Sequence, residues 1–293
     1  MADEILVPTD GSDGATAALE HALEVAAADD ARVHVLFVVD TTRDGLRSDD
    51  DEVLEVFEAR GAEIVTTAAE RASDRGVSVV DAVERGDPHE TILAYAETAA
   101  IDLITMGTHG RRGLRRLFLG SVTERVVRTA TVPVLTVREP TVDAITFPYE
   151  DVLVATDGSE CATAAVERGV ELAAERGATL HLLSVVDVTT TGAEVATGQL
   201  LEALEADARA TVETAADRAR EVGVSSVVTA VEVGSVSRGI TNYADEEGID
   251  LAVVGTHARR GVSRYVMGSV AELVVRTAPC PVVTVRTADA DET

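Results

Sequence analysis

The chain has 293 residues, and 52 acidic against 25 basic residues give it a net charge of −27. Almost half of the residues are hydrophobic, so the chain can bury a core, and at about 100–200 residues per domain its length predicts two domains. The charge excludes DNA and anionic membranes as main partners, because both require a broad basic surface.

Every basic residue is arginine, and the acids are spread through periodic hydrophobic segments rather than gathered in a tail. In molar salt the Debye length falls to about 3 Å, which screens the repulsion within such a surface. The composition therefore predicts adaptation to a salt-rich, halophilic cytoplasm. Met1 is followed by Ala-Asp-Glu without a basic segment or an apolar core region, so no secretory signal is expected. No apolar run approaches the roughly 20 residues that span a bilayer.

The first half of the chain alternates short apolar strands with helical segments. The expected strands are 5–8, 33–39, 77–83, 103–106 and 133–137, and the expected helices are 13–28, 49–75, 87–98 and 120–129. Continuous apolar strands that alternate with helices indicate a parallel sheet covered on both faces. Right-handed crossovers then produce a doubly wound, Rossmann-like α/β domain with five strands.

The second half repeats the first. Segments 5–40 and 152–187 are identical at 20 of 36 positions, and segments 102–138 and 250–286 at 23 of 37. The segment 139–150 contains two prolines and no period. The sequence thus predicts domains over 1–140 and 150–293, joined by a linker over 141–149.

Ligands of open α/β sheets bind beyond the carboxyl ends of the strands, where the strand order reverses. Two segments of each copy are expected at this place. In the first copy they are Pro8-Thr9-Asp10-Gly11-Ser12 and the stretch from Met106-Gly107 through Gly110 to Gly120-Ser121-Val122. The start of a helix near Gly120 favours an anion, because its first N–H groups are unpaired.

The loop between these glycines is basic in an otherwise acidic chain. Six arginines and one acid fall within 18 residues, and the second copy repeats part of the cluster. The arginines are Arg111, Arg112, Arg115, Arg116, Arg125 and Arg128, and in the second copy Arg259, Arg260, Arg264 and Arg276. Either they attract a phosphate group, or they are solvated side chains that pair with acids elsewhere.

On these motifs the chain resembles a tandem universal stress protein of the ATP-binding subclass. Nucleotide-binding members of that family carry Gly, two residues, Gly, nine residues, Gly and then Ser or Thr. The first copy matches with Gly107, Gly110 and Gly120-Ser121, whereas Ala258 replaces the second glycine in the other copy. The resemblance covers both halves and implies an adenine nucleotide α-hydrolase-like fold.

The resemblance also implies the residues that hold ATP, with a divalent ion such as Mg²⁺ or Mn²⁺ bound through the phosphates and no metal site formed by the protein alone. Asp10, with Pro8 and Thr9, would lie near the base and ribose, Val38 would contact adenine through its backbone, and Met106 and Gly107 would line the floor. The triphosphate would be held by Gly110, Arg111, Gly120, Ser121 and Val122. The second, weaker site would comprise Thr156, Asp157, Val185, Gly255, Gly268, Ser269 and Val270.

Some of these residues have simpler interpretations. Asp10 and Asp157 could simply cap the first helix of each copy through a turn. Gly110 could be required for a positive φ or for the close approach of a phosphate, and Ala258 weakens binding only if one of these holds. His109 and His257 are expected to have a loop role, His89 to lie on a surface helix, and His34 and His181 to be hydrogen-bonded strand residues.

The function expected from this pattern is an ATP-binding regulatory protein of the stress response, with little or no hydrolysis. A slow ATPase and a scaffold that binds no nucleotide are the alternatives. Against an enzyme, the sequence has no G-x-x-x-x-G-K-[ST] loop, no lysine and no catalytic residue that can be identified. In the family the fifth strands pair about a two-fold axis, which implies a pseudo-dimer within one chain and leaves a further homodimer open.

Overall fold

The structure is a computed structural model that describes residues 2–42, 51–110, 119–138, 146–188, 198–256 and 267–287. The chain divides into two compact units, Met1–Asp143 (unit 1) and Ala144–Thr293 (unit 2), and each is described by itself. Residues 141–145 of the predicted linker lie outside the described residues.

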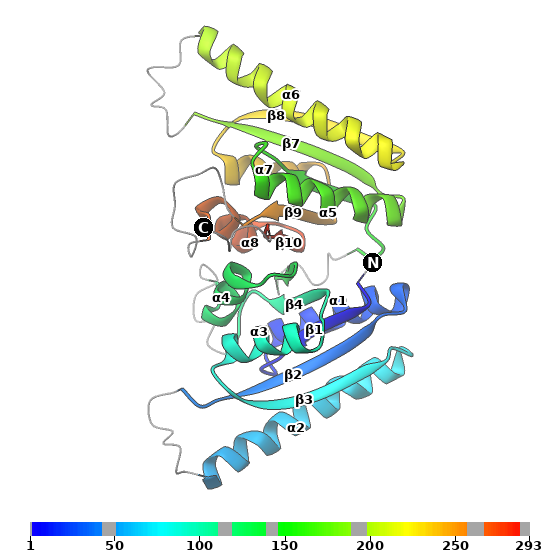
Figure 1. The fold of residues 1–293 in the computed structure, drawn as a ribbon, viewed down its shortest axis with the longest axis vertical. Helices are drawn as coiled ribbons and strands as arrows, with labels where there is room; N and C mark the ends of the chain where they lie inside the picture. Colours follow the sequence, from blue (N-terminus) through cyan, green and yellow to red (C-terminus); the bar gives the residue numbers. More distant parts are fainter. Residues whose placement is uncertain are drawn as a thin grey trace. The chain divides into compact units, whose positions relative to one another are not determined.

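Unit 1 alternates five strands with four helices, as the hydrophobic pattern predicts (Figure 1). Its strands are β1 (Glu4–Pro8), β2 (Arg32–Asp40), β3 (Val79–Gly86), β4 (Leu103–Gly107) and β5 (Val134–Val137). Its helices are α1 (Asp13–Asp29), α2 (Asp51–Asp74), α3 (Pro88–Thr98) and α4 (Ser121–Thr129).

Unit 2 repeats this order. Its strands are β6 (Asp151–Ala155), β7 (Thr179–Asp187), β8 (Ser226–Gly234), β9 (Leu251–Gly255) and β10 (Val282–Val285). Its helices are α5 (Glu160–Arg176), α6 (Gly198–Val222), α7 (Val236–Glu246) and α8 (Ser269–Thr277).

Both units contain a doubly wound parallel sheet, which confirms the predicted fold class. The strand order is β3-β2-β1-β4-β5 in unit 1 and β8-β7-β6-β9-β10 in unit 2. The chain moves outward from β1 to β3 and then returns to β4, so the order reverses between β1 and β4, and likewise between β6 and β9. The carboxyl ends of these paired strands are therefore the expected ligand site of each unit.

The cores are built from small aliphatic side chains. Ile5, Leu6 and Val7 in β1 and Val152, Leu153 and Val154 in β6 are completely buried. Strands that are apolar on both faces must be covered on both faces, and right-handed crossovers put α1 and α2 on one side of the sheet and α3 and α4 on the other. These buried strands hold the carboxyl-end loops in fixed positions.

The third strand begins and ends later than predicted. The apolar run suggested residues 77–83, whereas β3 spans Val79–Gly86 and includes Glu84 and Arg85. Among the described strands, β3 pairs with β2 alone, over the register Val33↔Val79 to Asp40↔Gly86. A strand at the margin of a sheet tolerates exposed charges, so the hydrophobic pattern alone misplaces its ends.

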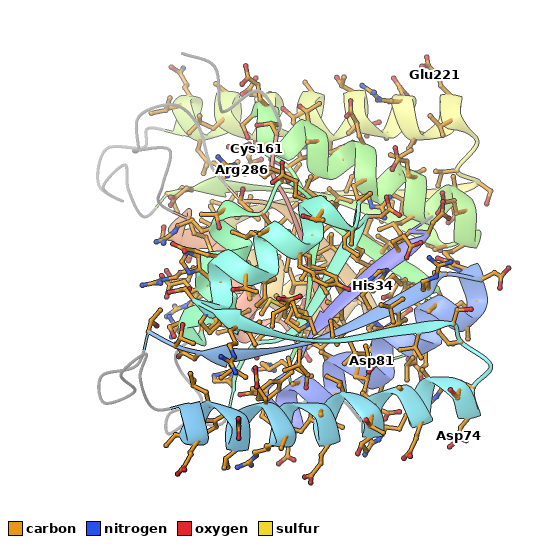
Figure 2. The ribbon with its side chains drawn as sticks, turned by 60° about the horizontal axis from the view of Figure 1, so that its bottom comes forward. His34, Asp74, Asp81, Cys161, Glu221 and Arg286 are labelled. Carbon is orange, nitrogen blue, oxygen red and sulfur yellow. The ribbon has the colours of Figure 1, made fainter. Side chains whose placement is uncertain are left out.

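A buried histidine joins three elements at the amino end of each sheet. His34 Nε2 lies 2.7 Å from Glu4 Oε2 at the start of β1, and its Nδ1 lies 2.9 Å from the hydroxyl of Tyr95 in α3 (Figure 2). In unit 2, His181 contacts Asp151 and the Tyr243 hydroxyl, both at 3.0 Å. The prediction that both histidines are hydrogen-bonded strand residues is confirmed.

The same arrangement makes Tyr243 a reporter of alkaline unfolding. Burial, together with the nearby charges of Glu247, Glu232 and Asp151, raises the pKa of Tyr243 to about 12. Because an unfolded tyrosine has a pKa near 10, the neutral phenol contributes stability that is complete below about pH 10 and lost as the pH rises through about 12. In an alkaline titration followed by phenolate absorbance, Tyr243→Phe is expected to lack the ionisation step near pH 12. If the variant lacks a step near pH 10 instead, the burial of this hydroxyl is contradicted.

Among the helices that the structure describes, none is long and apolar enough to cross a membrane.

Candidate functional site

The loop after β1 is held by its own side chains. The Thr9 N–H donates to Leu36 O of β2 at 2.8 Å, and the Gly11 N–H donates to Thr9 Oγ1 at 3.1 Å. The Ser12 N–H donates to Asp10 Oδ1 at 3.0 Å. Gly11 has a φ of 73°, a conformation that favours glycine. The loop is thus fixed with the Asp10 side chain in a defined place.

Ser12, and not Asp10, caps α1. The Ser12 hydroxyl accepts a hydrogen bond from the Ala15 N–H at 3.2 Å, and Ser12 has the extended backbone of a cap residue. In unit 2, Ser159 caps α5 in the same way, while Asp157 Oδ1 accepts from the Ser159 N–H at 2.9 Å. Asp10 and Asp157 therefore form the turn before the helix, as that interpretation has it, but the cap residue itself is the serine two positions later.

The end of β4 approaches α1 backbone to backbone. A Cβ atom added to Gly107 would lie 2.5 Å from both the carbonyl carbon and the oxygen of Gly14, and one added to Gly14 would lie 2.6 Å from His109 O. Side chains do not fit at such distances, so both positions require glycine for space. Gly14 is a site residue that the sequence analysis missed, because it lies outside the glycine pattern.

Gly110 brings this loop to the Asp10 carboxylate. A Cβ atom on Gly110 would lie 2.7 Å from Asp10 Oδ2. Gly110 does not have a positive φ, so of the two reasons considered for a glycine here the conformational one is wrong. The structure thus joins two predicted site residues that are 100 positions apart in the sequence.

The start of α4 lies at the same end of the sheet. The Gly120 N–H donates to Thr108 O at 2.8 Å, and the buried Thr123 hydroxyl donates to Gly107 O at 2.9 Å. Gly120 is the N-cap, and no side chain among the described residues caps the helix. Its first N–H groups and the positive end of its dipole therefore remain suited to an anion, with exposed Ser121 and half-buried Val122 beside them.

The other predicted residues of the first site take the following places. Pro8 and Met106 are buried at the ends of β1 and β4, and Val38 is half-buried near the end of β2, in register with Glu84 of β3. Arg111 lies outside the described residues, with Arg112, Arg115 and Arg116.

Unit 2 keeps the framework but differs at its contacts. Gly268 is the N-cap of α8 and donates to Thr256 O at 2.9 Å, and Thr156 N–H donates to Leu183 O at 2.9 Å. Cys161 stands where unit 1 has Gly14, and a Cβ on Gly255 would lie 2.8 Å from the Cys161 backbone. Ala271 replaces Thr123, so Gly255 O lacks the matching hydroxyl donor.

The remaining predicted residues of the second site are placed as follows. Val185 and Val270 are half-buried and Ser269 is exposed. His257, Ala258, Arg259, Arg260 and Arg264 lie outside the described residues.

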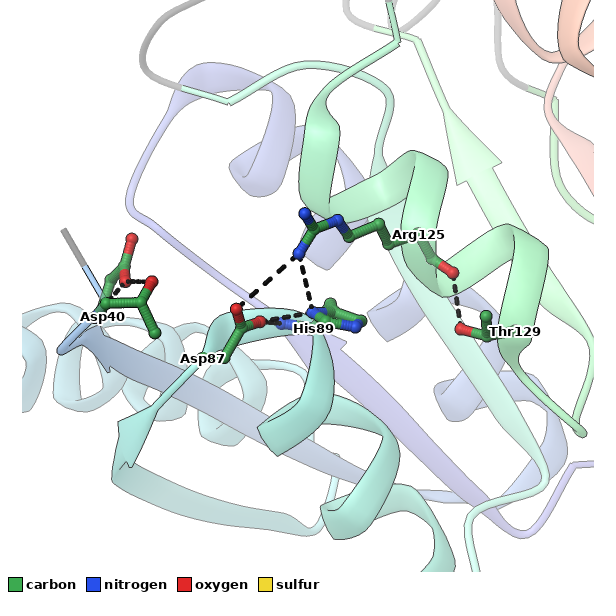
Figure 3. A network of polar contacts seen from close by, with 6 residues as sticks. Asp40, Asp87, His89, Arg125 and Thr129 are labelled. Atoms are coloured by element: carbon green, nitrogen blue, oxygen red, sulfur yellow. Dashed lines mark hydrogen bonds and ion pairs between the residues drawn. The ribbon is translucent and has the colours of Figure 1, made fainter. Parts of the chain in front are cut away.

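Of the three predicted cluster arginines that the structure describes, Arg125 and Arg276 pair with acids, as the simpler interpretation has it, whereas the Nε of Arg128 is buried without a hydrogen-bond partner. Arg125 reaches from α4 to the start of α3, where its Nη1 lies 3.8 Å from Asp87 Oδ2 and 3.3 Å from His89 Nδ1 (Figure 3). Arg276 pairs with Glu272 one turn away at 3.4 Å. These two side chains are neutralised by the protein itself and do not extend the anion site.

His89 belongs to this cluster rather than to an open helix surface. Asp87 caps α3, accepts from the His89 N–H at 3.0 Å and contacts its imidazole. Burial alone would raise the pKa of Asp87, but the hydrogen bonds and charge of His89 lower it below its ordinary value. Ser235, Ser237 and Leu273 occupy the matching places in unit 2, so the cluster is specific to unit 1.

His109 and the acidic residues provide no metal site. His109 Nδ1 lies 2.9 Å from the Thr108 hydroxyl, within its own loop. In the described ranges no group of three or more histidine, cysteine or carboxylate side chains is placed to hold a metal ion.

Comparisons with known proteins agree with this architecture. The sequence model of the Universal stress protein family matches residues 1–138 and again residues 148–286. Universal stress protein MJ0531 of Methanocaldococcus jannaschii is 38% identical over 140 residues, which cover 47% of this chain and 82% of that protein. Universal stress protein YxiE of Bacillus subtilis is 33% identical over 148 residues, covering 47% of this chain and 100% of that protein.

A solved structure shares the fold over both halves. The crystal structure of a universal stress protein from Archaeoglobus fulgidus aligns with a TM-score of 0.73 at 24% identity, covering 97% of this chain and 98% of that one. With the family match repeated in each unit, the chain belongs to the universal stress protein family and contains two of its domains in tandem.

Proposed function

We propose that this protein is an ATP-binding regulatory protein of the stress response, with its principal nucleotide site in unit 1. The observation that carries the proposal is the contact of Gly110 with Asp10, where a Cβ would lie 2.7 Å from the carboxylate. It supports the proposal because it brings a carboxylate, which can accept hydrogen bonds from ribose hydroxyls, against the glycine-containing loop at the point where the strand order reverses.

The phosphate groups would bind at the start of α4. Gly120 adds no side chain there, the first N–H groups face the loop end, and the sequence adds four arginines between residues 111 and 116. A Mg²⁺ or Mn²⁺ ion would be carried by the phosphates. We infer little or no hydrolysis, because the sequence has no G-x-x-x-x-G-K-[ST] loop and no lysine, and because Asp10 is held in its turn by the Ser12 N–H.

Unit 2 is proposed to bind more weakly. Its α8 start resembles that of α4, but Ala258, Ala271 and Cys161 replace residues that shape the site of unit 1. The Cβ of Ala258 would compete for the space of the Asp157 carboxylate if the loop followed the course seen in unit 1.

Gly110→Ala, which copies unit 2, is expected to weaken ATP binding to unit 1 about tenfold. The added methyl group must displace the Asp10 carboxylate, and a tenfold loss corresponds to about 1.4 kcal/mol. Calorimetric titration in molar KCl measures the change. Ala258→Gly is the reciprocal control and is expected to strengthen the second site; unchanged affinity in Gly110→Ala would contradict the role of this contact.

Equilibrium dialysis of the intact chain against ATP and Mg²⁺ in molar KCl tests the proposal. One ATP bound per chain supports it, two refute the inequality of the units, and none leaves the alternative of a scaffold without nucleotide. Steady turnover near 1 per second would overturn the regulatory function in favour of an ATPase.

Pairing of the fifth strands within one chain stays a prediction, which cross-linking at low concentration checks. A cross-linked species of one chain agrees with it, and an obligate dimer at every salt concentration does not.

A further inference from the structure

The outermost strand of unit 2 is long and regular. β8 pairs with β7 over nine residues without a break, from Thr179↔Ser226 to Asp187↔Gly234, and it ends the strand order of this unit. Among the described residues, the backbone of β8 forms strand-to-strand hydrogen bonds with β7 alone, and no loop residue is hydrogen-bonded to it. Such a strand offers a row of N–H and C=O groups to another strand.

The equivalent strand of unit 1, β3, carries exposed charged side chains. β3 exposes Asp81 (Figure 2), Glu84 and Arg85. Arg85 is bonded to Glu58 of α2, with its Nη2 2.8 Å from Glu58 Oε2. Exposed charges on a marginal strand oppose its pairing with other chains.

β8 has lost two of these three charges. Thr229 and Val233 replace Asp81 and Arg85, and Glu232 is the single charge that remains on the strand. Val228 and Val233 are 40% and 45% exposed. β8 has no proline or internal glycine, and its run from Ser226 to Val231 is uncharged, whereas the matching run of unit 1 contains Asp81.

We propose that β8 is an interface for a second copy of this chain, formed by antiparallel pairing of the two β8 strands about a two-fold axis at Ala230. In this register Glu232 faces Val228 of the other copy, and Thr229 faces Val231, so no two like charges are opposed. A two-fold contact closes on itself and yields a dimer rather than a filament.

The charge of the chain explains why a second copy would bind at β8 and why the binding would depend on salt. Two copies with the same acidic surface repel each other, and the repulsion is least where the surface is uncharged. α6, which packs on β8, contains six acidic and three basic residues, so the two α6 helices would repel across the axis. Because molar salt screens charges beyond about 3 Å, dimerisation strengthens as salt is added.

Val233→Arg restores the charge that unit 1 has at this place. Counted back from the glycine that follows each helix, Gly76 and Gly223, the carboxylates Glu58 and Glu205 both lie 18 residues earlier. A carboxylate therefore occupies the place of Arg85's partner in unit 2, where it pairs with Arg209 at 3.0 Å. The control is Val222→Arg, which changes another exposed valine (57% exposed), the last residue of α6 and outside β8.

Sedimentation of the full chain in about 0.1 M and 3 M KCl tests the interface. We expect a monomer–dimer equilibrium that shifts to dimer in high salt, is weakened at least tenfold by Val233→Arg and is unchanged by Val222→Arg. A chain that is monomeric at both concentrations, or a dimer that is indifferent to Val233→Arg, overturns the proposal.

Oxidation of cysteine variants tests the register. Directly opposed residues of antiparallel strands have Cα atoms about 4.5–5.5 Å apart, within the range of a disulfide. Ala230→Cys is therefore expected to form a covalent dimer in high salt, whereas Ser226→Cys, which would face Gly234, is not. Absence of the Ala230→Cys link, or an equal link in Ser226→Cys, overturns the two-fold pairing.

Discussion

Gly107→Ala is expected to lower the free energy of unfolding by about 1–3 kcal/mol and to abolish ATP binding to unit 1. The added methyl group would lie 2.5 Å from the Gly14 carbonyl, which is backbone at the buried start of α1 and cannot turn aside as a side chain can. The strand end must move, and the loop that carries His109 and Gly110 moves with it. Thermal unfolding followed by circular dichroism and titration with ATP measure the two effects.

Gly198→Ala is the matched control for this change. Gly198 lies at the start of α6 with no atom within 4 Å of an added Cβ, so its replacement is expected to be neutral or slightly stabilising, since alanine favours a helix. If Gly107→Ala unfolds at the temperature of the unaltered protein, the close approach of β4 to α1 is not what requires glycine at this position.

His181→Leu is expected to cost about 1–3 kcal/mol of stability, because it leaves the buried Tyr243 hydroxyl without the imidazole at 3.0 Å and removes the partner of Asp151. The measurement is chemical unfolding in molar KCl, with the unit 2 transition followed separately where the two units unfold apart.

The double variant His181→Leu/Tyr243→Phe distinguishes the loss of the hydrogen bond from the loss of side-chain packing. Replacing both partners by apolar groups is far less costly than orphaning one of them, so the second change is expected to restore part of the stability that the first removes. If the two costs simply add, the hydrogen bond contributes nothing beyond packing.

The repeated pattern of strands and helices was predictable because it depends on neighbours in the sequence. Buried strands such as β1 and β4 consist mainly of apolar residues, and the cap residue Ser12 marks the start of α1 in the sequence. The glycines of the first site could be found for the same reason, since their spacing is a property of one continuous loop.

Contacts between distant segments could not be predicted in this way. Nothing near Gly110 indicates that its neighbour is Asp10, and nothing near Gly14 indicates that His109 O lies against it. The partners of His34 come from β1 and α3, 30 and 61 residues away. Only the order of the strands brings these groups together. The pairing of Arg125, which the sequence analysis placed in the arginine cluster of the anion site, with Asp87 could not be predicted for the same reason.

The two ends of the sheets have changed by different amounts since the duplication. The histidine at the amino end keeps a carboxylate and a tyrosine in both units, with only Glu4 exchanged for Asp151, whereas Gly14, Thr123, Asp87, His89 and Arg125 at the other end all have different counterparts in unit 2. A saturation library scored for folding should therefore give nearly superimposable tolerance profiles for the two units around their histidines. When the same library is scored for stress survival, the tolerance profiles of the two units should differ at the carboxyl ends. The different contributions of the two units could then be measured before the ligand is known.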